Sequence, residues 1–234
     1  MIQLATKISE YLRALNNVSP LENIYSYEFN INRLPIEINF QNINTSFQRN
    51  IELKNRLHQI WLNSNQELKG NIIEYYIKIW GGIRGNSPET MEFYRTATTE
   101  ALLNGPFGRI SSWSKALVIH NPMRFLIYDS RVAISLNCLQ ARFNLENEEK
   151  IRFVIPQPNV RNGHPRRQVI NQFQNENCNN YNFWLNVNVE TQYYTYLELL
   201  EQVQINSGFD KCLIEMVLFQ ITDQLCDEHL RNRY

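Results

Sequence analysis

Lys115 and Asp129 stand 14 positions apart and are of types that enzymes use as a nucleophile and as a fixed anion. Lys115 is expected on a short helix that Asn121-Pro122 ends. The apolar run 125–128 then leads to Asp129, which opens a second apolar helix at Ser130. The dipole and the free N–H groups of a helix N-terminus favour a carboxylate there. The sequence therefore predicts a fixed negative charge at Asp129.

The order of these elements resembles the core of the helix-hairpin-helix DNA glycosylase superfamily. Members of that superfamily carry a lysine just after a hairpin, and an aspartate in a Val-Asp-x-His/Arg-Val motif that opens the next helix. Here Lys115-Ala116 is followed by a proline-containing loop and then by the run Asp129-Ser-Arg-Val-Ala. This run is most similar to the 8-oxoguanine DNA glycosylases, particularly to their archaeal branch.

The resemblance implies a DNA glycosylase that works as a monomer on double-stranded DNA with a flipped base, without a cofactor. Asp129 would stabilise the positive charge that develops on the sugar when the N-glycosidic bond breaks. Lys115 would be a nucleophile, which adds lyase activity through a Schiff base, or a phosphate anchor. The candidate DNA contacts are Ser112, Ser114, Arg131, Arg161, Arg166 and Arg167. The candidate base-pocket residues are Trp80, Trp113, Phe125 and Tyr128.

Two questions of function stay open. The target would be an oxidised base in repair, or a modified base of phage DNA in antiviral defence. The hairpin of the superfamily reads Leu-Pro-Gly-Val-Gly and grips a phosphate through its backbone, whereas residues 110–114 contain no glycine. Lys115 and Asp129 are also about one helical turn closer than in the superfamily. These differences favour a second hypothesis, a non-catalytic nucleic-acid-binding module that retains the fold.

Each candidate residue also has an ordinary structural interpretation. Asp129 would then be only a helix cap, Lys115 a solvated helix lysine, and Arg131 an ion-pair partner. Trp80 and Trp113 would pack in the core.

Charge is balanced over the chain but unevenly distributed. The 234 residues contain 23 Lys plus Arg and 23 Asp plus Glu, which excludes a uniformly basic surface. Residues 150–170 nevertheless hold five basic residues and no acidic one. This stretch would contact a DNA backbone or be a solvated loop. Apolar residues make up 43% of the chain, which excludes a disordered or collagen-like protein.

Other classes of protein are disfavoured by what the sequence lacks. No run approaches the roughly 18 uncharged apolar residues of a membrane helix, and the N-terminus has no signal-peptide core. The four scattered cysteines are typical of buried or free thiols in a cytoplasmic protein. Four histidines, with neither C-x-x-C nor H-E-x-x-H, argue against a zinc site.

The spacing of apolar residues predicts a mainly α fold, one two-lobed glycosylase-like domain over residues 1–234 with a small irregular or β insertion. Residues 145–190 should form this polar insertion, and segment 110–136 should line a cleft between the lobes, with 125–128 buried. Residues 20–50 could be an extended arm or short helices. Helices are expected over 2–15, 51–80, 88–103, 111–120, 130–139, 191–203 and 213–221.

Overall fold

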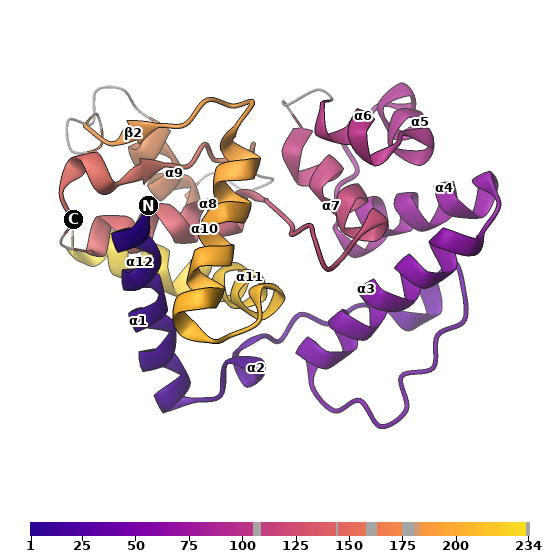
Figure 1. The fold of residues 1–234 in the computed structure, drawn as a ribbon, viewed down its shortest axis with the longest axis horizontal. Helices are drawn as coiled ribbons and strands as arrows, with labels where there is room; N and C mark the ends of the chain where they lie inside the picture. The colour runs from indigo at the N-terminus through magenta and orange to yellow at the C-terminus, as the bar shows by residue number, and fades with distance from the viewer. Residues whose placement is uncertain (105–108, 144, 158–162, 175–180, 182, 233–234) are drawn as a thin grey trace. The chain divides into compact units, whose positions relative to one another are not determined.

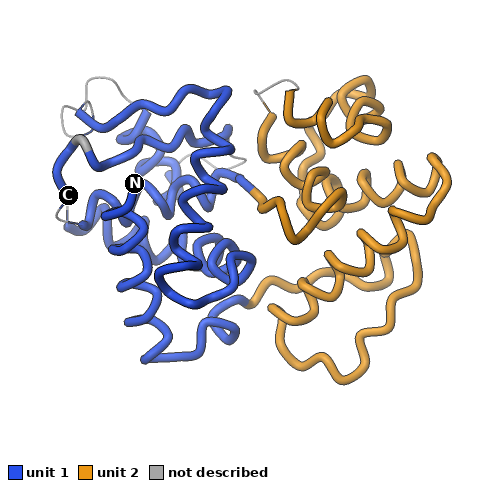
Figure 2. The backbone as a smooth tube through the Cα atoms, viewed as in Figure 1, with its two compact units in different colours: residues 1–25, 128–234 blue, residues 26–127 orange. Residues whose placement is uncertain are grey.

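The computed structural model describes residues 1–104, 109–143, 145–157, 163–174, 181 and 183–232, and it is mainly helical, as predicted (Figure 1). The chain divides into two compact units (Figure 2). Unit 1 comprises Met1–Tyr25 and Tyr128–Tyr234, and unit 2 comprises Ser26–Ile127. Unit 1 is therefore built from two separate stretches of chain, while unit 2 is one continuous stretch.

Helix α8 (Ser130–Arg142) forms the centre of unit 1, with an unbroken row of buried residues from Val132 to Gln140. Helices α9, α11 and α12 pack against it, and α1 packs against α10. The other elements of this unit are α1 (Ile2–Val18), α2 (Leu21–Ile24), a 3-10 turn (Asn147–Glu149), β1 (Ile151–Arg152), α9 (Pro165–Gln174), β2 (Leu185–Asn186), α10 (Gln192–Ser207), α11 (Lys211–Gln220) and α12 (Thr222–Asn232).

Two buried amides on α8 hold the segment around β1 in place. Asn137 Nδ2 donates to the Phe153 carbonyl over 2.8 Å, and Phe153 N donates back to Asn137 Oδ1 over 3.1 Å. Gln140 makes the same pair of bonds with both backbone groups of Ile151. The two side chains thus take the place of a neighbouring strand, because they satisfy backbone groups that would otherwise be buried without partners. On its other side β1 pairs in parallel with β2.

Unit 2 surrounds helix α7 (Ile110–His120), in which ten of the eleven residues are buried. Helices α3 and α6 and the π-helix η2 pack against α7. The remaining elements are a 3-10 turn (Ile31–Arg33), α3 (Ser46–Asn63), α4 (Gln66–Glu74), η2 (Tyr75–Trp80), α5 (Pro88–Thr96) and α6 (Thr99–Leu103). Apart from the short turn, residues 26–45 are irregular.

Several predicted boundaries are confirmed and others are wrong. Residues 125–128 are all buried, as expected for the approach to α8. Gly208 ends α10 with a left-handed φ of 80°. The helix predicted over 51–80 is instead three segments, since Asn65 caps a new helix at Gln66. The helix over 88–103 breaks at Thr98, which caps α6. The last predicted helix, over 213–221, corresponds to α11, and α12 after it was not predicted.

Two further corrections concern the predicted site region. Helix α7 begins at Ile110, one residue before the predicted start at 111, and Arg109 is its N-cap. Ser112 is buried and exchanges hydrogen bonds with Asn86. The polar insertion contains helix α9, which buries Val169, among others, and was not predicted.

Acid is expected to destabilise unit 2 through His120. Its ring stacks on Trp61 at a centroid distance of 4.2 Å and is hydrogen-bonded to Thr99. Burial, with smaller effects from His58 and Lys69, lowers the pKa of His120 from 6.5 to about 4. The unfolded chain therefore takes up a proton first as pH falls, and stability present above pH 6.5 is lost down to pH 4.

Through this residue alone, the free energy of unfolding should be about 2 kcal/mol lower at pH 5 than at pH 7. Urea unfolding at the two pH values measures this difference, and His120→Gln should reduce it by that amount. An equal pH dependence in the wild type and in His120→Gln would contradict the assignment.

Candidate functional site

Asp129 is the N-cap of α8, as the sequence predicted. Its Oδ1 accepts hydrogen bonds from the backbone N–H groups of Arg131 at 2.9 Å and Val132 at 3.1 Å. Oδ2 has no hydrogen-bond donor among the described residues, and the side chain is half-buried. One oxygen therefore fixes the carboxylate to the helix while the other is left for a further interaction.

Two buried tyrosines surround the start of α8 in unit 1. Tyr128 donates its hydroxyl to the Val154 carbonyl at 2.8 Å, and its ring meets Tyr196 edge to face at 5.1 Å. Burial raises the pKa of both phenols well above 10, and the negative charge of Asp129 adds to the effect on each. Both phenols are therefore neutral.

Two of the predicted DNA-contact arginines meet at one carboxylate. Asp223 Oδ1 lies 2.8 Å from Arg166 Nε, and its Oδ2 lies 3.7 Å from Arg131 Nη2. These three residues, termed here the arginine–aspartate cluster, join α8, α9 and α12. Arg131 is thus an ion-pair partner in this structure. Arg167 follows on α9 and is half-buried, and Arg161 lies outside the described residues.

Lys115 lies in unit 2 and is not the solvated lysine that an ordinary helix surface would carry. Its side chain is 3% exposed, and its Nζ donates to the Ser111 carbonyl at 3.0 Å. Gly81 packs directly on it: a Cβ at that position would lie 2.6 Å from Lys115 Cε and 2.8 Å from the Ile77 carbonyl. Only glycine allows this approach of the backbone to the lysine.

Gly81 directly follows the π-helix η2, which positions it against Lys115. Gly81 N bonds to the Tyr76 carbonyl five residues earlier, at 3.0 Å. A π-turn inserts an extra residue into a helix, and such turns are frequent at functional sites. The glycine pair after Trp80 was visible in the sequence, but its role beside Lys115 was not predicted.

The other predicted residues of unit 2 are in its interior. Ser112, Trp113, Ser114 and Phe125 are each at most 2% exposed. Trp80 stacks on Tyr76 at a centroid distance of 4.4 Å and donates its indole N–H to Asn50. These side chains therefore have core contacts in this structure. Arg109, which directly precedes α7, is exposed. It was not among the predicted DNA-contact residues.

Comparison with protein-family models, curated proteins and solved structures finds no match.

The candidate residues fall into two sets, one in each unit. Unit 1 holds Asp129 with Tyr128, Arg131, Arg166 and Arg167, and unit 2 holds Lys115 with Ser112, Ser114, Trp80, Trp113 and Phe125. A joint site of Lys115 and Asp129 stays a prediction. Among the described residues no three His, Cys, Asp or Glu side chains are grouped to bind a metal ion. None of their helices is both long and apolar enough to span a membrane.

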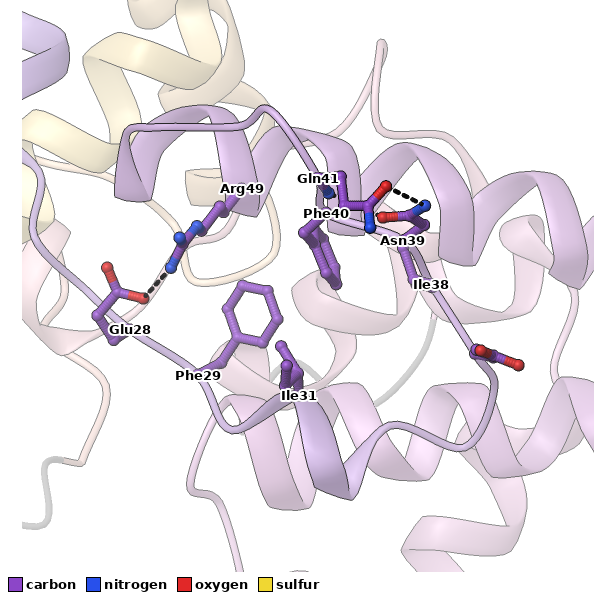
Figure 3. A pocket seen from close by; sticks show the side chains of 9 residues that line it. Glu28, Phe29, Ile31, Ile38, Asn39, Phe40, Gln41 and Arg49 are labelled. Atoms are coloured by element: carbon purple, nitrogen blue, oxygen red, sulfur yellow. Dashed lines mark hydrogen bonds and ion pairs between the residues drawn. The ribbon is translucent and has the colours of Figure 1, made fainter.

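A hollow of about 540 Å³ lies in unit 2, between the irregular segment 28–41 and the start of α3 (Figure 3). The rings of Phe29 and Phe40 point into it and meet edge to face at 5.5 Å. At one end Arg49 pairs with Glu28 over 3.5 Å. Its lining includes none of the predicted site residues, so it is separate from the predicted base pocket.

A smaller hollow of about 290 Å³ lies in unit 1. Its lining residues are Arg152, Phe153, Val154, Ile155, Phe173, Gln174 and Asn186. Tyr128, one of the predicted base-pocket residues, borders it through the hydrogen bond to Val154.

Proposed function

We propose that the protein is a DNA glycosylase that excises a damaged or modified base, with Asp129 as its essential carboxylate. The observation that supports this most directly is the half-buried Asp129, held by Oδ1 with Oδ2 unused. A carboxylate fixed in this way can stabilise an oxocarbenium-like sugar without the cost of reorganising at the moment of reaction. The resemblance of the segment around Lys115 and Asp129 to helix-hairpin-helix glycosylases points to the same chemistry.

An abasic-site assay tests the proposal. Undamaged, oxidised and phage-modified duplexes are incubated with the protein, and alkali then reveals any base that has been removed. Excision from an oxidised duplex favours repair, and excision from a phage-modified duplex favours defence. No excision from any duplex, together with tight binding, would favour the second hypothesis.

The second hypothesis is a nucleic-acid-binding module without catalysis. It is favoured by the interior position of Ser112 and Ser114, which could have replaced the missing hairpin glycines as phosphate ligands. If both serines serve only packing, the hairpin type of phosphate grip is absent and the arginines of unit 1 must bind the backbone.

Duplex binding is expected to weaken steeply with salt. Each phosphate that Arg131, Arg166 or Arg167 neutralises should contribute about −0.9 to the slope of log affinity against log salt, because counterions are released. Fluorescence anisotropy with a labelled duplex between about 50 and 200 mM salt measures this slope. An affinity that stays constant over this range would argue against DNA as the partner.

A further inference from the structure

In the arginine–aspartate cluster two cations converge on one anion. One carboxylate, that of Asp223, presents one oxygen to Arg166 at 2.8 Å and the other to Arg131 at 3.7 Å. Arginines bind a phosphate in a similar way, with guanidinium groups converging on the oxygens of one anion. A phosphodiester group carries two such oxygens on one atom, so it can take the place of the carboxylate.

Contacts other than this carboxylate hold the side chain of Arg131 and the backbone of Arg166. The Arg131 guanidinium lies over the ring of Phe219 at 4.6 Å from its centroid. Thr222 donates to the Arg131 carbonyl at 3.2 Å, which ties the start of α12 to the first turn of α8. Arg166 donates its backbone N–H to His164 at 3.2 Å. The Arg131 guanidinium therefore has a contact that does not depend on the carboxylate.

Asp223 is more exposed to solvent than the two arginines with which it pairs. The side chain of Asp223 is 50% exposed, whereas those of Arg131 and Arg166 are 27% and 16% exposed. Asp223 is thus the most exposed member of the cluster, although its Oδ1 and Arg166 Nε are themselves covered. An exposed ion pair of this kind contributes at most about a fivefold change in an equilibrium constant, so a phosphate can displace it.

We propose that Arg131 and Arg166 form one binding site for a phosphodiester group, and that Asp223 fills this site in the free protein and leaves it when DNA binds. The inference rests on the proposed function, because it takes DNA as the partner. Arg131 follows the Asp129 cap by two residues, so the bound phosphate would flank the nucleotide presented to Asp129. Asp223 lowers DNA affinity, since each binding event must first break its two ion pairs.

The test compares Asp223→Asn with Glu228→Gln in duplex binding. Glu228 lies on the same helix and pairs with Arg142 at 2.9 Å, so its variant makes the same change in net charge away from the cluster. Asp223→Asn should bind a duplex about fivefold more tightly than Glu228→Gln at low salt. Its slope against log salt should be steeper, because salt anions can then occupy the site and are released when DNA binds. Adding Arg166→Gln to Asp223→Asn should abolish the gain.

A second measurement does not depend on DNA. Inorganic phosphate should raise the melting temperature of Asp223→Asn more than that of Glu228→Gln, because ligands that bind only the folded state stabilise it. Equal affinities and equal phosphate effects in the two variants, or weaker duplex binding by Asp223→Asn, would overturn the inference while leaving the proposed function intact. If no protein binds a duplex but phosphate still stabilises Asp223→Asn selectively, the anion site stands and DNA as the partner is wrong.

Discussion

Asp129→Asn is expected to lower the rate of base excision by at least about 10²-fold, the scale on which one preorganised electrostatic group is felt. The carboxylate meets a charge that develops only in the transition state, so turnover should fall far more than binding. Duplex affinity should stay the same or increase, since a negative charge is removed. Single-turnover excision and anisotropy measure the two effects separately.

The structure offers a matched control for this change. Asp210 caps α11 in the same unit, and its Oδ1 accepts from the N–H groups of Cys212 and Leu213. Asparagine is as good an N-cap as aspartate, so both variants should fold. Asp210→Asn should retain full excision. If Asp129→Asn also did so, Asp129 would be only a helix cap and the catalytic assignment would be withdrawn.

Loss of Lys115 is expected to abolish covalent capture of the protein on DNA. If its amine attacks C1′, the resulting Schiff base is reduced by borohydride to a stable protein–DNA adduct. Either role requires the amine to leave the Ser111 carbonyl and reach DNA, since the Lys115 side chain is 3% exposed, and we expect the nucleophile role. Lys115→Met, which keeps the apolar stem and removes the amine, should abolish both trapping and strand nicking.

Lys54 provides the comparison, because it is also a buried lysine of unit 2, at 2% exposure. Lys54→Met should retain trapping if Lys115 is the nucleophile. Wild-type protein that excises a base but is never trapped would instead assign Lys115 to phosphate binding. In that case Lys115→Met should weaken binding and make the salt slope shallower by about one phosphate.

The start of α8 could be predicted because three local signals agree there: an apolar approach, a capping residue and a helical period. Helix α9 was missed because it lies in a polar, arginine-rich stretch, and only Val169, Ile170 and Phe173 mark its buried side. The burial of Lys115 could not be predicted either. Helix α7 is enclosed on almost all sides, so its polar residues do not mark a solvent-facing stripe.

Asp223 was also outside the reach of sequence reasoning. It lies on α12, far along the chain from Arg131 and Arg166, and ion pairs between distant segments have no local pattern. Arg166 was noticed through the excess of basic residues around it, and Arg131 through its place in the run Asp129-Ser-Arg-Val-Ala. Their pairing with Asp223 was not predicted.

The discontinuity of unit 1 has a consequence for the order in which the chain can fold on the ribosome. Residues 26–127 are continuous, so unit 2 can bury its own core as soon as it has emerged. Helix α1 cannot reach its packed position until α10 is synthesised, because it packs against α10. Ser9 on α1 donates a hydrogen bond to the Val203 carbonyl on α10. Until that helix is synthesised, Leu4, Ile8 and Leu12 have no α10 to cover them. The apolar face of α1 thus stays without its α10 partner until late in translation, when it can be a target for chaperones.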